Sequence, residues 1–475
     1  MASSLVDTAK PQELHIQIGN KPAVAQFAVE SGFTVLHINE RRVKNTKLST
    51  DLRNVLYAEM LPDNTVKIAT LARRKKSLAL VFVTGTLRDP DTPQTAQEWI
   101  SNLMTTAYNG APLHRRLKVL VNPAGGKGRG IHLFEKKVRP ILVAAHCEVD
   151  AITTERPGHA TDLAQSFPLD YDALLTVSGD GLIFEVMNGF RRRPDSAKAF
   201  ALPICPIPAG SGNALSINLF GVKEGFDIAL ASLNAIKGKR MSYDLCSFTQ
   251  NGETSVSFLS QAIGLMADID LGTENLRWMG DTRFIAGYLR SVGQNRPCAM
   301  TLSMRVVHSD KTEMAKALHT LKASAEVDLA PRFANEDVGG PEWLTFEKPI
   351  LYLYAGTMPY VGRDLMAFPV SLPSDGLVDV SVQELVSRPL MLKMISGAEK
   401  GDQFWLPSHH YYKVEAYRLR PHESHGNLSI DGERFPYKEF HVEVLKGLGT
   451  TLSLTGTWAG DFGKENAAVK GKTTS

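Results

Sequence analysis

Three glycine-containing segments in the middle of the chain carry residues that could bind phosphate groups. They read NPAGGKGRG from Asn122, SGDG from Ser178 and PAGSGN from Pro208. Glycine lets the backbone approach a phosphate closely, and successive N–H groups in such a loop form a cradle for an anion. One loop of this kind is equally well explained as a turn. Three such loops at one place would indicate a phosphate-binding site.

Asp180 is the residue in these segments that could do acid–base chemistry. It stands between Gly179 and Gly181 in the second loop. Phosphoryl transfer to an alcohol needs a carboxylate that accepts the hydroxyl proton. The flanking glycines leave this carboxylate open to two substrates at once. The alternative is an aspartate that only forms a turn.

The loops do not fit the two commonest nucleotide-binding fingerprints. Arg129 follows Gly128, so the first loop lacks the Gly-Lys-Ser/Thr ending of a P-loop. Ile131 stands where the last glycine of a G-x-G-x-x-G motif would be. We therefore predict phosphate binding by neither a P-loop NTPase nor a Rossmann dehydrogenase.

The segment 114–242 contains the elements that must position these loops. Strands are predicted over 117–121, 173–177 and 203–207, and helices over 130–145, 184–190 and 213–220. This alternation predicts a parallel α/β sheet, whose strands end at one edge. Open α/β sheets bind ligands at that edge. Each glycine loop follows one predicted strand, so the three loops should meet.

The N-terminal region, 1–113, is predicted to be β-rich. Strands are predicted over 33–38, 54–60, 65–71 and 78–84, followed by one helix over 92–108 that Pro93 opens. Several strands followed by one helix resemble a pleckstrin-homology-like domain. The region holds the chain's net charge of +3, with basic clusters at 41–47 and 73–76. These clusters are solvated loops or attract an anionic membrane surface.

The segment 243–463 turns β-rich again, with apolar runs over 255–263, 299–307, 350–356 and 428–430. It predicts an antiparallel β-sandwich for lipid binding. A polar insertion or mobile loop is expected over 308–347, with a helix near 311–325, and a disordered tail over 464–475. The predicted fold class is therefore a parallel α/β nucleotide-binding domain followed by an antiparallel β-sandwich, after a β-rich N-terminal region.

Composition limits the class of protein. The four cysteines form no pair or cluster with metal-ligand spacing, so we expect free thiols in a reducing compartment and no structural metal. The sequence shows neither a signal peptide nor a run of about 18 uncharged apolar residues. The charge balance is too small to indicate nucleic acid. A cytoplasmic protein that meets membranes peripherally is expected.

The three motifs NPAGGKGRG, SGDGLIFEVMNG and PIPAGSGNALS are together similar to the diacylglycerol kinase catalytic domain superfamily. SGDGL followed by E-V-x-N-G resembles the sphingosine kinase branch, because diacylglycerol kinases usually have Gly-Gly-Asp-Gly-Thr there. The likeness runs from about 117 to 454. It implies ATP-dependent phosphorylation of the primary hydroxyl of a sphingoid long-chain base, with Mg²⁺.

The resemblance also implies roles for individual residues. Asp180 is the catalytic base, and Ser260 and Asp270 hold the polar head of the lipid. A carboxylate suits this head because a free amine is cationic near neutral pH. The implied nucleotide-binding residues are Asn122, Gly125, Gly126, Lys127, Thr154, Ser178, Gly179, Gly210, Ser211, Gly212, Glu274, Arg277, Arg283, Asp431, Gly432 and Glu433. Ala124 stands where some family members have an arginine, so that phosphate contact is absent.

Two rival functions stay open at this point. One is another lipid kinase of the same superfamily, acting on ceramide or diacylglycerol. The other is a non-catalytic lipid-binding scaffold on the same fold. Leu265, Ile269 and Phe284 are candidates for lining a site for the hydrocarbon tail. A homodimer is a further open alternative.

Overall fold

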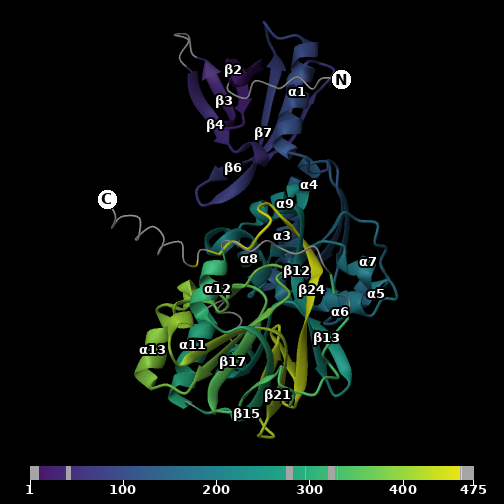
Figure 1. Cartoon of the computed structure of the whole chain (residues 1–475). Helices are drawn as coiled ribbons and strands as arrows, with labels where there is room; N and C mark the ends of the chain where they lie inside the picture. The colour runs from purple at the N-terminus through teal and green to yellow at the C-terminus, as the bar shows by residue number, and fades with distance from the viewer. Residues whose placement is uncertain are drawn as a thin grey trace. The chain divides into compact units, whose positions relative to one another are not determined.

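The structure is a computed structural model that describes residues 10–38, 44–273, 282–294, 296–318, 327–328, 330–460 and 462 (Figure 1). The chain divides into two compact units. The first comprises 1–118, 132–150 and 227–239, and the second comprises 119–131, 151–226 and 240–475. The predicted basic residues at 41–43 and the predicted tail over 464–475 lie outside the described residues.

A seven-stranded sheet and one helix make up most of the first unit. The strand order is β4-β3-β2-β1-β7-β6-β5. The bounds are β1 (Gln12–Ile18), β2 (Lys21–Ala28), β3 (Gly32–Ile38), β4 (Lys44–Thr50), β5 (Val55–Met60), β6 (Thr65–Arg74) and β7 (Ser77–Leu87). The four predicted strands are present as β3, β5, β6 and β7. The basic residues at 73–76 lie at the end of β6 and in the turn to β7.

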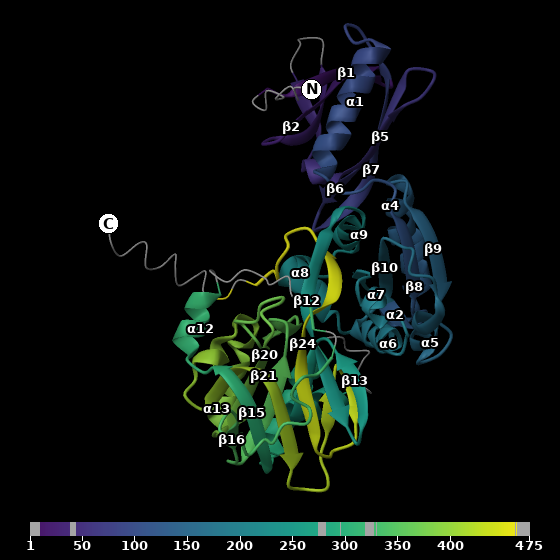
Figure 2. The same ribbon diagram turned by 45° about the vertical axis from the view of Figure 1, so that its right-hand side comes forward.

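Helix α1 (Pro93–Tyr108) lies against this sheet (Figures 1 and 2). Thr92 caps it and Pro93 opens it, as the sequence predicts. Trp99 Nε1 donates to the Gln12 carbonyl at 3.0 Å, and the Tyr108 hydroxyl donates to the Leu56 carbonyl at 2.7 Å. These bonds satisfy the polar atoms of two buried aromatic side chains that fix the helix on the sheet.

The glycine loops belong to a four-stranded sheet in the order β11-β10-β8-β9. Its strands are β8 (Arg116–Val121), β9 (Glu148–Thr153), β10 (Ala173–Ser178) and β11 (Ile204–Pro208). β10 and β11 pair in parallel, with Val177 opposite Ile207. Both strands therefore end at the same edge.

Helices connect the strands of this sheet, and Figure 2 shows α5, α6 and α7 beside β8, β9 and β10. They are α2 (Gly125–Gly128), α3 (Gly130–Leu133), α4 (Arg139–Ala144), α5 (His159–Ser166), α6 (Asp180–Arg191), α7 (Ser196–Phe200), α8 (Ala214–Glu224) and α9 (Ile228–Lys237). One π-helical turn, Phe134–Val138, interrupts the helix predicted over 130–145. Pro140 explains it, because proline lacks an N–H and its ring displaces the carbonyl of the preceding turn.

The remainder of the second unit is β-rich. Eleven strands form one sheet, in the order β13-β12-β24-β21-β20-β17-β14-β22-β23, with β15 on β21 and β16 on β15. They are β12 (Lys239–Gln250), β13 (Glu253–Ser257), β14 (Ser260–Gly264), β15 (Met300–His308), β16 (Leu344–Phe346), β17 (Ile350–Gly356), β20 (Val378–Glu384), β21 (His409–Pro421), β22 (Leu428–Ile430), β23 (Glu433–Phe435) and β24 (Phe440–Ser453). Side chains from β12, β15, β20 and β24 meet in one buried cluster, so the sheet curls around an apolar interior.

Smaller elements complete this part of the chain. β18 (Tyr360–Gly362) and β19 (Leu365–Met366) form a separate two-stranded sheet. The helices are α10 (Leu265–Gly272), α11 (Thr282–Gln294), α12 (Lys311–Ala317) and α13 (Arg388–Ile395). No helix among the described residues is long and apolar enough to cross a membrane.

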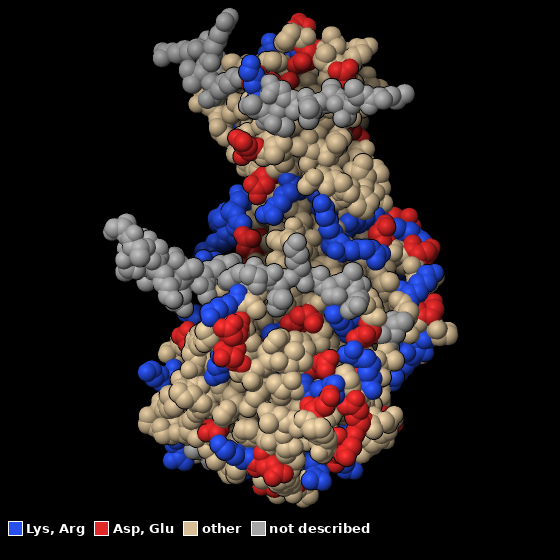
Figure 3. All heavy atoms as spheres, in the orientation of Figure 1, with Lys and Arg blue, Asp and Glu red and all other residues tan. Residues whose placement is uncertain are grey.

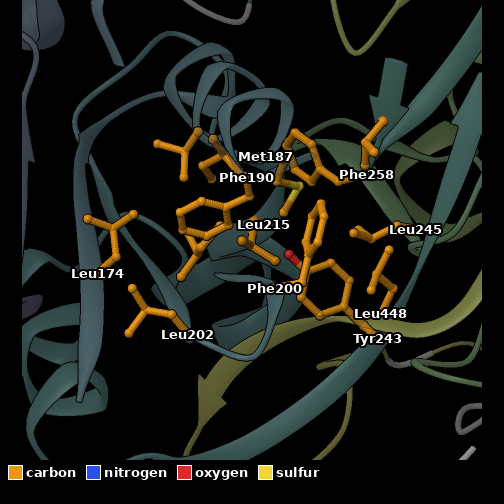
Figure 4. Close-up of a cluster of buried hydrophobic side chains, with 14 of the residues drawn as sticks. Leu174, Met187, Phe190, Phe200, Leu202, Leu215, Tyr243, Leu245, Phe258 and Leu448 are labelled. Carbon is orange, nitrogen blue, oxygen red and sulfur yellow. The ribbon is translucent and has the colours of Figure 1, made fainter. Parts of the chain in front are cut away.

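The α/β and β-rich parts of the second unit share one hydrophobic core. Figure 4 shows Leu174, Phe190 and Leu215 from the α/β part close to Tyr243 and Leu448 from the β-rich part. Burial of these large side chains is the main stabilisation available to the unit. The domain boundary near 242 stays a prediction. In the structure, residues from both sides of this position pack in one hydrophobic core.

The expected insertion over 308–347 is packed onto the sheet where the structure describes it. Phe333 and Trp343 are buried, and the Glu443 carboxylate accepts the backbone N–H groups of Arg332 and Phe333. The helix predicted near 311–325 is described as α12, and 319–326 lie outside the described residues. The charged composition of 308–347 predicted a loop. The contact that holds this segment on the sheet could not be predicted, because its partner Glu443 lies far away in the sequence.

None of the four cysteines, all of which lie among the described residues, forms a disulfide. Cys205, Cys246 and Cys298 are buried, and Cys147 is half-buried. The prediction of free thiols is therefore confirmed.

Candidate active site

The three glycine loops lie against one another at the carboxyl edge of the parallel sheet. The Gly126 N–H donates to the Ala209 carbonyl, which joins the first loop to the third. A Cβ atom on Gly210 would lie 2.2 Å from the Gly179 Cα atom, which brings the second and third loops into backbone contact. A Cβ atom on Gly125 would lie 3.3 Å from the Ala209 oxygen. The glycines are thus required for the loops to approach so closely.

Polar side chains brace the first two loops. Asn122 Nδ2 donates to Ser178 Oγ at 3.1 Å, and Asn122 Oδ1 accepts the Ala124 N–H at 3.0 Å. Thr154 is buried beside them, and its N–H donates to the Val121 carbonyl at 2.9 Å. The predicted residues Asn122, Ser178 and Thr154 are therefore at neighbouring strand ends.

Asn213 closes the third loop, which also contains the predicted residues Ser211 and Gly212. Its Oδ1 accepts the Gly210 N–H at 3.0 Å, and its Nδ2 donates to the Gly210 carbonyl at 2.8 Å. Asn213 was part of the recognised motif but not of the predicted site. Its position at the start of the helix predicted over 213–220 was the available signal, since asparagine favours turns and helix starts.

Asp180 lies where the second and third loops meet and is the first residue of α6. Its Oδ2 accepts the Ala214 N–H at 2.7 Å and its Oδ1 accepts the Leu215 N–H at 3.3 Å, so the carboxylate caps the first turn of α8. Only 9% of the residue is exposed. Burial raises the pKa of Asp180 to about 6, although the two N–H groups oppose this shift. A carboxylate with such a pKa can exchange protons near neutral pH.

A two-residue turn joins β22 to β23 beside this carboxylate. Asp431 and Gly432 occupy the turn, with φ of 51° and 86°, and Ile430 pairs with Glu433. Positive φ at both positions is typical of the hairpin turns that Asp-Gly favours. Asp431 is buried, and burial raises its pKa to about 6.

The turn lies between the Asp180 loop and Asp270. A Cβ atom on Gly181 would lie 3.7 Å from Glu433 Oε1. A Cβ atom on Gly432 would lie 4.0 Å from Asp270 Oδ2. The structure therefore brings together the base candidate, the late Asp-Gly-Glu segment and the lipid-head candidate.

The two predicted lipid-head residues come from successive elements. Ser260 is buried at the start of β14, and Asp270 lies on α10. Asp270 Oδ2 accepts the Ser429 hydroxyl at 2.5 Å. The tail candidates Leu265 and Ile269 are buried in a cluster with Tyr352.

Some predicted residues cannot be placed. Glu274 and Arg277 lie outside the described residues, as does the side chain of Phe284. Lys127 is in α2 and Arg283 is in α11, and their side chains are likewise outside what the structure describes.

Two further findings bear on ligands. Within the described part of the chain, no three His, Cys, Asp or Glu residues are arranged to hold a metal ion. A cavity of about 900 Å³ is lined by α12, residues 370–377 and Lys413, and its described lining includes none of the predicted site residues. Size alone would favour this cavity as the site, but the convergent polar groups lie at the glycine loops.

Comparison with known proteins places these features in a family. Residues 116–248 match the model of the diacylglycerol kinase catalytic domain. Sphingoid long chain base kinase 4 of Schizosaccharomyces pombe is 34% identical over 421 residues, which cover 86% of this chain and 89% of that protein. Human sphingosine kinase 1 is 32% identical over 330 residues, which cover 67% of this chain and 85% of that protein.

A solved structure from Bacillus anthracis, described as a diacylglycerol kinase, has the same fold. The TM-score is 0.52 at 20% identity, with 71% of this chain and 97% of that chain covered. At this identity the likeness concerns the fold alone. It agrees with an α/β part followed by a β-rich part.

Proposed function

This chain belongs to the family of sphingoid long-chain base kinases, and we propose that the site around Asp180 transfers the γ-phosphoryl group of ATP to the primary hydroxyl of a sphingoid base. The observation that carries the proposal is the position of Asp180. Its carboxylate lies where the second and third glycine loops meet, and the next residue, Gly181, faces Glu433. The chain is a lipid kinase, and the residue roles that follow are proposals.

The glycine loops bind the phosphates of ATP. Their N–H groups and the N-termini of α6 and α8 favour negative charge at this edge. The open space supports this role. Among the described residues, a Cβ atom on Gly128 would meet nothing within 4 Å, and one on Gly181 would meet only Glu433. Asn122, Thr154, Ser178, Ser211 and the other nucleotide assignments stay predictions.

Asp180 accepts the proton of the acceptor hydroxyl. The hydroxyl oxygen forms the new P–O bond, the bond between the γ-phosphorus and the ADP oxygen breaks, and the proton passes to the Asp180 carboxylate. An ionised carboxylate has about four lone-pair sites, of which the Ala214 and Leu215 N–H groups use two. Two sites therefore remain, one of which can take the incoming proton, and no covalent enzyme intermediate is needed.

Magnesium enters this proposal with the nucleotide. When bound, the ion neutralises charge on the phosphates. Glu433 would be the protein group that faces the ion, because its Oε1 would lie 3.7 Å from a Cβ atom on Gly181.

Asp270 selects the lipid by charge. A sphingoid base carries an ammonium group, whereas ceramide and diacylglycerol carry none, so a carboxylate favours the base. Ser260 assists at the hydroxyl end of the same head group. The apolar interior of the β-rich part then accommodates the hydrocarbon tail.

Further proposals concern the rest of the molecule. The seven-stranded sheet closed by α1 supports a pleckstrin-homology-like N-terminal region, and the curled eleven-stranded sheet supports a β-sandwich. Peripheral contact with a membrane surface and a cytoplasmic location also stay predictions. Neither depends on the chemistry at Asp180.

A matched pair of variants on α10 tests the assignment of Asp270. Asp270→Asn should raise the KM for sphingosine about 10- to 100-fold, because a hydrogen bond to a charged group is lost. The KM for ATP should stay unchanged. Asp268→Asn is the control, since Asp268 lies on the same helix and its carboxylate accepts the Asn427 amide at 2.7 Å. Equal effects of the two variants would contradict charge selection by Asp270.

A further inference from the structure

The Asp431 carboxylate is held by four hydrogen-bond donors within the protein. Oδ1 accepts the Ser257 hydroxyl at 2.8 Å, the Leu259 N–H at 3.0 Å and the Ser260 N–H at 2.8 Å. Oδ2 accepts the Phe258 N–H at 2.8 Å. Three donors thus crowd Oδ1, and Oδ2 keeps one further accepting site. Because Asp431 is buried, a metal ion or a nucleotide has little access to that site.

The carboxylate sits in a ring of consecutive backbone N–H groups. Residues 258–260 aim three successive N–H groups at Asp431, an arrangement that elsewhere binds free anions. The Asp431 N–H also donates back to the Ser260 carbonyl at 2.8 Å. The anion of this nest is therefore a side chain of the protein.

The segment held in this way leads directly to the predicted lipid contacts. Residues 258 and 259 separate β13 from β14, although the sequence predicted one strand over 255–263. Ser260 starts β14, and β14 leads into α10 with Asp270. The position of Asp431 thus fixes where the acceptor-binding segment begins.

Asn188 ties the other end of the same segment to the helix of the base. Its Nδ2 donates to the Val256 carbonyl at 2.9 Å, and its Oδ1 accepts the Val256 N–H at 2.9 Å. Asn188 lies on α6, which starts at Asp180. Residues 256–260 are therefore held from α6 on one side and from the β22–β23 turn on the other.

We propose that Asp431 is a positioning residue for the lipid acceptor and not a ligand of the nucleotide. Its carboxylate holds 257–260 and, together with Asn188, sets the place of Ser260 relative to Asp180. The inference rests on the proposed function for the roles of Ser260 and Asp180. The proposal assigns different roles to two residues of the Asp-Gly-Glu segment. Asp431 positions the acceptor, whereas Glu433 faces the phosphate side at Gly181.

Asp431→Asn is the direct test. The amide keeps the size of the side chain but places an NH₂ group against one of the N–H donors, so one bond becomes a repulsive contact. Amide hydrogen exchange of 258–260 should accelerate at least about tenfold. The kcat/KM for sphingosine should fall about 10- to 100-fold, while the KM for ATP and the Mg²⁺ dependence stay unchanged.

Asp244→Asn is the matched control. Asp244 is also fully buried, and its carboxylate accepts the backbone N–H groups of Gly376 at 2.7 Å and Gly447 at 2.6 Å. The substitution is the same, but no predicted site residue is a partner. Asp244→Asn should leave amide hydrogen exchange at 258–260 unchanged. It should also leave the kcat/KM for sphingosine unchanged relative to that for ATP, whatever its effect on the melting temperature.

Three outcomes would overturn the proposal. They are unchanged exchange at 258–260 in Asp431→Asn, a raised KM for ATP with normal sphingosine kinetics, and the same kinetic pattern in both variants. Failure of the proposed function would appear in the wild-type protein alone, as an absence of sphingosine phosphorylation. The exchange measurement would then still decide whether Asp431 holds 257–260.

Discussion

A buried carboxylate that caps a helix is usually held ionised by the N–H groups it accepts, but Asp180 is also almost completely desolvated. Desolvation is the larger effect and raises its pKa to about 6. This places the proton equilibrium of the proposed base close to neutral pH. A base with a pKa near the working pH combines the right protonation state with a useful affinity for the proton.

The activity should therefore fall on the acidic side of pH 6. Below the pKa Asp180 is protonated and cannot accept the hydroxyl proton, so kcat/KM should drop about tenfold for each pH unit. Initial rates with sphingosine between pH 4.5 and 8 measure this, with circular dichroism to show that the fold persists. A rate that is flat down to about pH 4.5 would contradict a base with the pKa of Asp180.

Residue-scale features differed in how far the sequence could reveal them. Asp180 was predictable because a carboxylate between two glycines at a strand end is a local pattern. The role of Asp431 was not, because Ser257 and Ser260 lie more than 170 positions away in the sequence. Asn188 was missed for the same reason, since its partner Val256 belongs to another part of the fold.

At the scale of elements, hydrophobic periodicity predicted β8, β10, β11 and the helices that follow them. It missed β1, although Leu14, Ile16 and Ile18 alternate with polar residues as a half-buried strand requires. It also missed β9, whose pattern is short and mostly half-buried. The break between β13 and β14 could not be predicted, because the Asp431 carboxylate causes it.

Two glycines in neighbouring loops should respond differently to the same substitution. Gly210→Ala should lower the melting temperature and weaken ATP binding, because the new Cβ would lie 2.2 Å from Gly179 Cα and 2.5 Å from its nitrogen. Gly181→Ala should keep the fold, because its Cβ meets only Glu433 Oε1 at 3.7 Å. The methyl group should nevertheless reduce phosphoryl transfer, since it enters the proposed substrate space.

Thermal unfolding and transfer rates, measured on both variants, separate these effects. A wild-type melting temperature for Gly210→Ala would contradict the close contact of the second and third loops. Full activity of Gly181→Ala would contradict the placement of substrate between Asp180 and Glu433.

At the scale of the whole molecule, one core connects the helices that start at the glycine loops to the segment 257–260. Phe190 and Leu215, from helices that start at the loops, pack in the same cluster as Phe258 from the turn that Asp431 holds. Contacts over such sequence distances could not be read from local patterns. Displacing one glycine loop should therefore also displace residues at the acceptor side of the site, because the packed core transmits the shift.

Charged side chains on the surface of the second unit are mixed in sign. Over its face in Figure 3, acidic and basic side chains are interspersed and separated by uncharged areas. The near-neutral net charge of +3 agrees with this pattern.

The most direct test of the account is transfer of labelled phosphate from ATP to sphingosine, ceramide and diacylglycerol, compared between the wild-type protein and Asp180→Asn. The account predicts label on sphingosine and a loss of about 10²–10⁴ in rate for the variant, with ATP binding retained. Label on ceramide or diacylglycerol instead would contradict the role of Asp270. Full activity of Asp180→Asn, or no transfer to any lipid by the folded wild-type protein, would contradict the central claim.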